Sequence, residues 1–356
     1  MKVENNLIEL MKFLPENYEQ TCYETNTIKG SRVIKSPKEL MFFCLLYLSQ
    51  KYSLIELSSF AKLKGIKLSD VAFMKKLAKC SEWYKQIIKD MLPLVVFQYK
   101  KPKGLEDYDL LAVDASNVTQ KGKDKKVFRL HYMINICNLS TEECKITTEK
   151  VGETLTNFSI KPKYLIIADR AYCSKVSIKH CLDNVGNFII RLPNKAFNLY
   201  DSKDNKISLL SELEKSNETT PIDFIAYILN YDGTKTKLRI CGIKKSPEGI
   251  AKSSKRIARN EIRKQTVYSD ETKSINNYLV VVSCLNEAIS ASDILEIYSL
   301  RWQVELYFKR LKSILDFGDI PNKKEKNVIS WLNGKMLLSL LLEKFYAEVN
   351  FSPYGD

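Results

Sequence analysis

The sequence predicts a mixed α/β fold, in which a helical N-terminal region precedes a mixed sheet with helices on its faces. Three observations indicate this class. Helical patterns fill residues 1–100, apolar runs typical of strands dominate residues 105–193, and helical periodicity returns after Asp293. The chain has 356 residues, of which 45% are hydrophobic, so it is long enough for two or three domains.

The N-terminal region carries two helix-start signals. In "SPKEL", Ser36 is the expected N-cap, Pro37 the first helical residue and Glu39 the capping-box partner. Ser53 and Glu56 repeat the capping box. The turn "GIKLS" then separates two helical segments. This outline fits a DNA-binding helix-turn-helix, and it fits a plain helical bundle equally well.

Composition indicates which kind of binding partner and which cellular compartment to expect. The formal net charge of +14 favours a polyanion such as nucleic acid over an anionic membrane, although a protein that is merely basic is also compatible with it. The longest apolar run, residues 40–48, is too short to cross a bilayer, and the charged start predicts no signal peptide. Nine irregularly spaced cysteines and two histidines argue against a zinc site. We expect a soluble, cytoplasmic protein with no membrane partner.

Two predicted strands end in aspartate. Asp114 closes "LLAVD" and Asp169 closes "LIIAD". Ligands of open α/β sheets bind at the carboxyl ends of the strands, so both carboxylates are candidates for a site. Aspartate is also a common turn-forming residue, which leaves a purely structural role open for each.

A helical segment near residue 300 carries a narrow polar stripe. Tyr298, Arg301, Glu305 and Lys312 fall within about 60° of arc on a helix. The alternative is a solvated face, because Arg301 and Glu305 form a favourable i,i+4 pair.

Together, the three acids suggest one chemistry. Asp114, Asp169 and Glu305 are predicted as catalytic metal ligands for two Mg²⁺ ions, which prefer oxygen ligands and promote phosphodiester cleavage. Tyr298, Arg301 and Lys312 would then hold DNA phosphates beside them.

Residues 194–288 form a polar, turn-rich stretch with short predicted strands, which indicates a β-rich insertion. Its segment "GIAKSSKRIARNEIRKQ", if helical, gathers five cations within about 100° of arc. We expect them to contact DNA rather than form a merely solvated face: Lys252, Lys255, Arg256, Arg259 and Arg263.

These motifs carry a family resemblance over roughly residues 30–349. The chain resembles DDE transposases of bacterial insertion sequences, in the insertion-sequence-four type branch with the Tyr-Arg-Glu-Lys (YREK) signature. That signature is Tyr298, Arg301, Glu305 and Lys312. The first acid lies in "DASNVTQKG", where Asp114, Ser116 and Gly122 match. The second lies in "DRAYCS", where Asp169, Arg170 and Tyr172 match.

The resemblance implies a ribonuclease-H-like catalytic fold and cut-and-paste DNA transposition. It implies a metal-dependent enzyme that uses Mg²⁺, with Mn²⁺ as a substitute, and that acts on terminal inverted repeats and target DNA as a homodimer in the bacterial nucleoid. Arg170 and Tyr172 are added to the expected DNA contacts. The expected domains are a helical DNA-binding domain at 1–104, a catalytic domain at 105–193 and 289–325, the β-rich insertion at 194–288 and a C-terminal helical segment at 326–356.

The sequence departs from the family pattern in two places. The branch often uses a tryptophan in the insertion to hold a flipped base, but the three tryptophans here lie elsewhere, so Tyr268 or Tyr278 would have to substitute. The chain also stops soon after a predicted helix, and a fuller C-terminal dimerisation region is expected to be missing. Two alternatives stay open: a non-catalytic DNA-binding protein derived from a decayed transposase, and a nuclease that never joins strands.

Overall fold

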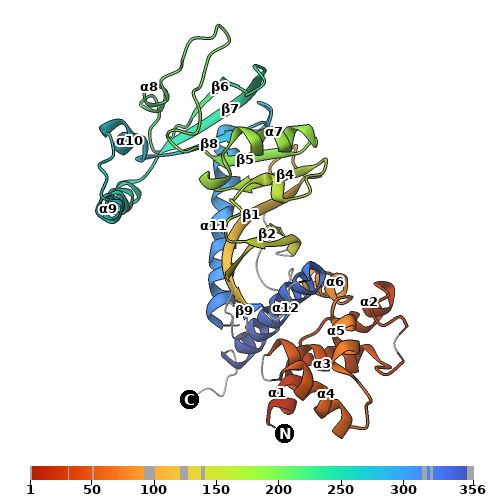
Figure 1. Cartoon of the computed structure of the whole chain (residues 1–356). Coiled ribbons are helices and arrows are strands. Elements are labelled where there is room, and N and C mark those ends of the chain that lie inside the picture. Colours follow the sequence, from red (N-terminus) through yellow and green to blue (C-terminus); the bar gives the residue numbers. More distant parts are fainter. Residues whose placement is uncertain are drawn as a thin grey trace. The chain divides into compact units, whose positions relative to one another are not determined.

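The chain folds into two compact units (Figure 1). The computed structural model describes residues 2–30, 32–49, 52–91, 101–120, 127–137, 141–314, 319–320 and 324–350. The first unit, here the helical unit, comprises Met1–Tyr99, Ala115–Val151 and Val304–Asp356; the second, the sheet unit, comprises Lys100–Asp114 and Gly152–Gln303. Within the described residues, none of the helices is both long and apolar enough to span a bilayer.

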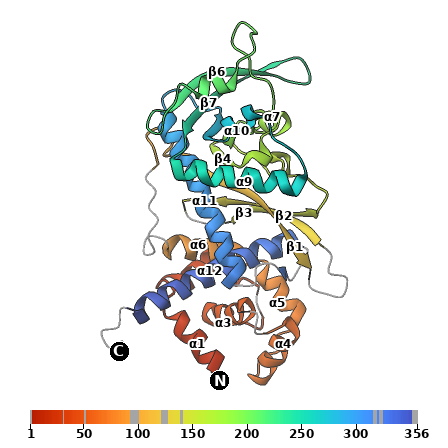
Figure 2. The ribbon, with the colours of Figure 1, turned by 90° about the vertical axis from the view of Figure 1, so that its left-hand side faces the viewer.

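Most of the helical unit is a bundle around one apolar helix (Figure 2). Its helices are α1 (Lys2–Met11), α2 (Tyr18–Glu24), α3 (Pro37–Leu48), α4 (Leu54–Leu63), α5 (Asp70–Leu77), α6 (Ser81–Met91) and α12 (Glu325–Asn350). Nine of the twelve residues of α3 are buried, as expected of a helix that is apolar on all sides. Helix α12 packs on α3 and α6.

The helix starts agree with the sequence signals except in one detail. The Ser36 hydroxyl accepts a hydrogen bond from the Glu39 amide at 3.1 Å, and Ser53 and Glu56 form a complete capping box. The Glu39 carboxylate, however, accepts from the amide of Lys35 at 2.9 Å and not from that of Ser36. The expected reciprocal box at Ser36 is therefore wrong, because the acid reaches one residue further back.

A small β-structure completes the helical unit. Strands β2 (Val127–Asn135) and β3 (Thr141–Thr148) pair antiparallel, and the short β9 (Asp319–Ile320) pairs in parallel with the end of β1 (Asp109–Gln120). Strand β1 begins in the sheet unit and ends in the helical unit.

The sheet unit contains six strands in the order β1, β4, β5, β8, β7, β6. The bounds are β4 (Tyr164–Ala168), β5 (Asn187–Arg191), β6 (Ile222–Leu229), β7 (Lys235–Lys244) and β8 (Tyr278–Ser283). Strands β1, β4 and β5 run parallel, whereas β8, β7 and β6 continue the sheet antiparallel. This mixed sheet with helices confirms the predicted α/β fold class.

Helices and short 3-10 turns connect these strands. They are η2 (Leu155–Asn157), η3 (Arg170–Tyr172), α7 (Lys175–Asp183), α8 (Leu209–Leu213), α9 (Pro247–Lys264), α10 (Asp270–Ile275) and the first part of α11 (Ala291–Ile314). Helix α7 packs on β5, while α9 and α10 lie away from α7 at the left of Figure 1.

The close approach of α7 to β5 depends on a glycine. A Cβ atom added at Gly186 would overlap Ile160 Cγ2 and lie 3.0 Å from Cys181 Sγ. At Gly152, by contrast, an added Cβ meets nothing within 4 Å.

We therefore expect Gly186→Ala to destabilise the sheet unit by about 1–3 kcal/mol, the usual cost of overpacking a core. Urea-induced unfolding of the full chain measures this. Gly152→Ala is the control and should change the unfolding free energy by less than about 0.5 kcal/mol. Equal stabilities for the two variants would contradict the packing argument.

Candidate active site

A row of charged residues crosses three parallel strands. Ala112 of β1 is in register with Ile167 of β4, and Ala168 of β4 with Ile190 of β5. Continuing both registers places Asp114, Asp169 and Arg191 side by side. Since neighbouring strands lie about 4.8 Å apart, the two carboxylates come from adjacent backbone positions.

The buried residues of the strands determine where this row of charged residues lies. In β1, Leu110 to Val113 are buried, and in β4 so are Leu165 to Ala168. Asp114 and Asp169 are half-buried, and so is Arg191. Each charged residue is thus the first half-buried one after an apolar run. Asp169 follows the end of β4, as the sequence predicted. The prediction that Asp114 ends its strand is wrong, because β1 continues to Gln120, where it pairs with β9.

Asp169 also has the turn-forming role that the sequence left open. One carboxylate oxygen, Oδ1, accepts a hydrogen bond from the Ala171 amide at 2.8 Å and caps η3. Within the described part of the chain, no hydrogen bond is made to its Oδ2. The residue therefore serves as a cap and still presents one oxygen to a ligand.

The turn after Asp169 contains two predicted DNA contacts with different surroundings. Arg170 is partly buried beside Asp169. Tyr172 is 0% exposed, and its ring lies 6.5 Å from that of Phe158. This placement favours support of the η3 turn by Tyr172 over a direct contact with DNA.

Helix α11 carries the predicted YREK stripe. Tyr298 is 5% exposed, and the Arg301 guanidinium lies over its ring at 5.7 Å. Among the described residues, the buried Tyr298 hydroxyl has no hydrogen-bond partner. Glu305 and Lys312 belong to α11, but their side chains lie outside the described set, and Gly122 lies outside it altogether. Among the described side chains, no group of three His, Cys, Asp or Glu residues is placed to hold a metal ion.

A buried arginine fixes the start of α11. Arg239 of β7 is 3% exposed and pairs with both carboxylate oxygens of Asp223, at 2.8 and 2.5 Å. Its other nitrogen donates to the backbone carbonyls of Asn286 and Ile289, at 2.6 and 2.7 Å. Ser290 then caps the helix by accepting from the Asp293 amide at 3.0 Å. The helix that carries Tyr298 is thereby tied to the sheet.

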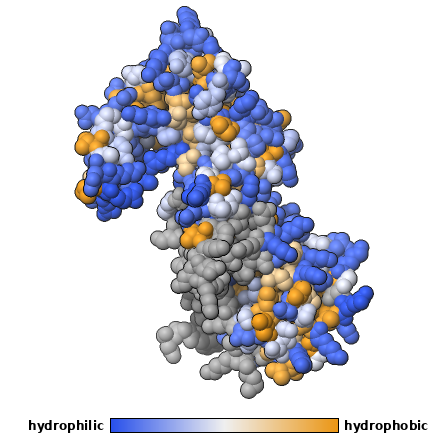
Figure 3. All heavy atoms as spheres, viewed as in Figure 1, coloured by the Kyte–Doolittle hydropathy of each residue, from blue (hydrophilic) through white to orange (hydrophobic). Residues whose placement is uncertain are grey.

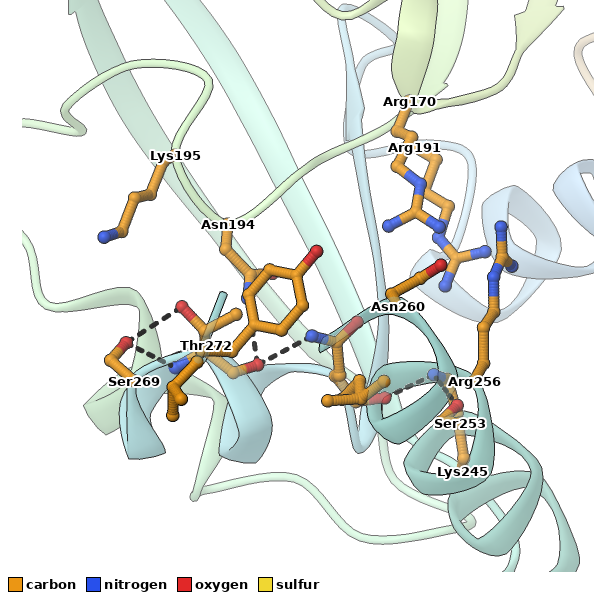
Figure 4. A pocket seen from close by; sticks show the side chains of 14 residues that line it. Arg170, Arg191, Asn194, Lys195, Lys245, Ser253, Arg256, Asn260, Ser269 and Thr272 are labelled. Atoms are coloured by element: carbon orange, nitrogen blue, oxygen red, sulfur yellow. Dashed lines mark hydrogen bonds between the residues drawn. The ribbon is translucent and has the colours of Figure 1, made fainter. Parts of the chain in front are cut away.

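A basic pocket of about 380 Å³ lies in the sheet unit. Figure 4 shows the guanidinium groups of Arg170, Arg191 and Arg256 close to one another, with Lys195 at the other end. None of its lining residues is acidic; they are Arg170, Arg191, Asn194, Lys195, Lys245, Ser253, Arg256, Ile257, Asn260, Val267, Tyr268, Ser269, Thr272 and Asn276. Tyr268 lines it, whereas Tyr278 is not among these residues.

Repulsion among the cations of this pocket lowers the pKa of two of them. Burial lowers the pKa of Lys245 to about 8, and repulsion from Arg191, Arg170 and Arg256 adds to the effect. Burial and the charges of Arg191 and Arg256 also lower the pKa of Arg170, although Asp169 and Tyr298 act in the opposite direction. The pocket is therefore an unneutralised positive site beside Asp169.

Sequence reasoning missed Arg191 and Lys245. A signal for Arg191 was present, because it closes the apolar strand "FIIR" as the aspartates close theirs. Lys245 follows β7 and has no comparable local signal.

Fold and site define a class: an α/β protein in which two carboxylates on neighbouring parallel strands are suited to a divalent metal. A family profile described as "Transposase DDE domain" matches residues 105–341. The chain belongs to this family, which is that of the predicted resemblance.

Individual proteins of insertion sequences are also similar to this chain. The InsL protein of insertion sequence element IS186A from Escherichia coli (strain K12) is 23% identical over 342 residues, which cover 92% of this chain and 90% of that protein. The transposase for insertion sequence element IS421 from Escherichia coli is 23% identical with the same coverage. The transposase for IS231F from Bacillus thuringiensis subsp. israelensis is 27% identical over 199 residues, or 51% of this chain and 42% of that protein.

The Arg239 contacts lead to a stability prediction. We expect Arg239→Met to lower the unfolding free energy by roughly 3 kcal/mol, because it leaves a carboxylate and two carbonyls, one of them buried, without their donor. Urea-induced unfolding of the full chain measures the loss.

Lys235→Met, on the same strand, is the control. Lys235 forms an exposed pair with Asp204, so its loss should cost less than about 1 kcal/mol. A similar loss for both variants would show that the Arg239 contacts are no more stabilising than a surface pair.

Proposed function

We propose that this chain is a DNA transposase that cleaves DNA at the ends of an insertion sequence and joins the freed ends to target DNA. The observation that carries the proposal is the register of Asp114 and Asp169 on parallel strands inside a transposase DDE domain. Glu305 of α11 is assigned as the third acid by its place in the YREK signature.

The family implies dependence on a divalent metal, and the donor set fits one. Carboxylate oxygens are the ligands that Mg²⁺ prefers, and Asp169 retains an oxygen that takes no hydrogen bond from the described residues. We assign Asp114, Asp169 and Glu305 to hold two Mg²⁺ ions, for which Mn²⁺ can substitute. Such ions, when bound, polarise the scissile phosphate and stabilise the attacking and leaving oxygens.

The neighbouring side chains orient the DNA strand. Arg170 lies next to Asp169 and offers a guanidinium to a phosphate close to the acids. The Tyr298 hydroxyl, buried without a partner among the described residues, is suited to donate to a phosphate oxygen, and Arg301 stacks on its ring. Lys312 completes the set by its position in the signature.

Helix α9 supplies a basic face. None of its 18 residues is buried, and the five predicted cations are all exposed. Figure 3 shows a mainly hydrophilic surface around this helix, at the left. Its exposed cations suit an anionic partner, and we assign them to DNA phosphates.

The helical unit offers a second DNA-binding surface. Helices α4 and α5 pack together across a six-residue turn, in the outline of a helix-turn-helix. A cavity of about 1050 Å³ in the same unit is lined by four lysines: Lys75, Lys79, Lys324 and Lys326. We assign this surface to the terminal inverted repeats, in a homodimeric complex that acts on DNA in the bacterial cytoplasm.

Removal of single carboxylates tests the catalytic assignment. We expect Asp114→Asn, Asp169→Asn and Glu305→Gln each to lower metal-dependent cleavage and joining by at least about 100-fold. The substrate is a labelled duplex with the element's terminal repeat, incubated with Mg²⁺ or Mn²⁺. Asparagine also caps helices, so Asp169→Asn should leave the η3 turn intact.

Asp107→Asn is the matched control, because Asp107 is an exposed carboxylate near the start of β1. It should cleave and join at the wild-type rate. Normal cleavage by an Asp114 or Asp169 variant would refute the assignment. Repeat binding without cleavage by the wild type would indicate a non-catalytic DNA-binding protein, and cleavage without joining would indicate a nuclease.

Salt dependence tests the basic face of α9. Replacing Lys252, Lys255, Arg259 and Arg263 with glutamine should flatten the slope of log K against log salt by about 2–4, since each phosphate contact contributes about 0.9. A variant that exchanges lysine and arginine at the same four positions keeps the charge and should keep the slope. Equal slopes for the glutamine variant and the wild type would remove α9 from the interface.

A further inference from the structure

The cavity beside α5 in the helical unit is lined by apolar side chains as well as by lysines. The apolar lining residues come from α4, α5 and the residue that follows α5: Leu54, Val71, Met74 and Ala78. We infer that α5 lies in the major groove of the terminal repeat and that Val71 selects a thymine by contact with its 5-methyl group. The inference rests on the proposed function, which gives the helical unit DNA as its ligand.

One face of α5 is fixed against the core of the helical unit. Phe73 and Leu77, four residues apart, are buried. The ring centroid of Phe73 lies 6.3 Å from that of Phe43 and 6.1 Å from that of Tyr47, both on α3. The side chain of Ser69 caps the first turn of α5. Because these contacts fix the rotation and the start of the helix, α5 presents a constant set of side chains on its other face.

The other face of α5 is the one that lines the cavity. Val71, Met74, Lys75 and Ala78 all line it, and their offsets of zero, three, four and seven place them on one side of a helix. Val71 is 58% exposed, and Met74 is half-buried beside it. Apolar surface that stays exposed and is bordered by charged residues is typical of an interaction site.

The charges around the cavity indicate which part of the DNA each residue meets. Four exposed cations are suited to phosphates: Lys75, Lys79, Lys324 and Lys326. The first turn of α5 differs, because it carries Asp70, whose carboxylate accepts a hydrogen bond from the Val71 amide at 2.8 Å. A helix N-terminus ordinarily attracts anions, but here an acid already occupies it. Beside this carboxylate, a base edge is a more favourable neighbour for Val71 than a phosphate.

Thymine is the base whose major-groove edge suits Val71. Of the four bases, thymine is the one that presents an apolar group in that groove, its 5-methyl group. The groove is about 12 Å wide and admits an α-helix, and in a helix-turn-helix the first residues of the second helix contact base edges. Val71 is the second residue of α5. Burial of one methyl group between valine and thymine corresponds to about fourfold in affinity.

The test compares thymine with uracil, which pairs in the same way but lacks the 5-methyl group. The full chain is titrated, in EDTA so that no cleavage occurs, with labelled terminal-repeat duplexes in which each thymine is replaced singly by uracil. We expect replacement at one or two positions to weaken binding about fourfold. Val71→Ala should bind the all-thymine duplex at least about fourfold more weakly and should no longer respond to uracil at those positions.

Two control variants accompany Val71→Ala. Val176 is also the second residue of its helix, α7, and is 52% exposed, but it lies in the sheet unit outside this cavity. Val176→Ala should keep both the affinity and the thymine dependence of the wild type. Alanine favours helix more than valine does, so both valine variants should keep their helices. Lys326→Gln should weaken binding of thymine and uracil duplexes equally and lower the salt slope by about 0.9.

Three results would overturn the inference. One is equal affinity for every uracil duplex, and another is a thymine dependence that Val71→Ala leaves unchanged. The third is an equal loss of affinity for thymine and uracil duplexes in Val71→Ala, which would mean that Val71 meets DNA without reading the methyl group. All three leave the proposed function standing as long as the wild type binds and cleaves the repeat. If the wild type binds the repeat no more tightly than an unrelated duplex, the assignment of the helical unit to the repeats fails as well.

Discussion

The register of three parallel strands is the constraint on which the candidate site depends. Strands β1, β4 and β5 are aligned so that Asp114, Asp169 and Arg191 follow their last apolar residues at the same level. A slip of one residue would turn a buried face to solvent, so the apolar strands hold the charged row in place. The geometry of the candidate site is therefore a consequence of core packing.

The same sheet edge meets two opposite electrostatic requirements. Asp114 and Asp169 lie at neighbouring positions of two parallel strands, and carboxylate oxygens so arranged suit a cation. One strand further on, Arg191 and its neighbours crowd positive charge and lower the pKa of Lys245, which is unfavourable unless an anion lies between them. A metal ion on the carboxylate side and a DNA phosphate on the arginine side would meet both requirements. The buried strands and the Arg239 contacts at the start of α11 hold these charged groups in place.

The sequence predicted those features that depend on residues close together in the chain. The α/β class, the capping residues Ser36 and Ser53 and the place of Asp169 after β4 all follow from local patterns, and the structure agrees with them. Asp114 was expected to end its strand but lies within β1, because pairing further along the strand extends it. Arg191 and Lys245 were missed because their importance arises only when β5 joins β4 and the end of β7 comes near α9. The burial of Tyr172 was missed for the same reason, since its ring is covered by Phe158 from another segment. Long-range pairing has no local signature.

Helix α9 has well-formed ends but carries like charges along an exposed face. It begins with Ser246 as cap and Pro247 in its first turn, and it ends at Gln265 in the left-handed conformation, so its termini are well formed. Between them it buries no residue and places like charges four apart, at Lys252 and Arg256 and again at Lys255 and Arg259. Such pairs destabilise a helix by a few tenths of a kcal/mol each, roughly as much as opposite charges stabilise it. A polyanion along this face would remove the repulsion, so the residues proposed to bind DNA are also those whose helix would be stabilised by it.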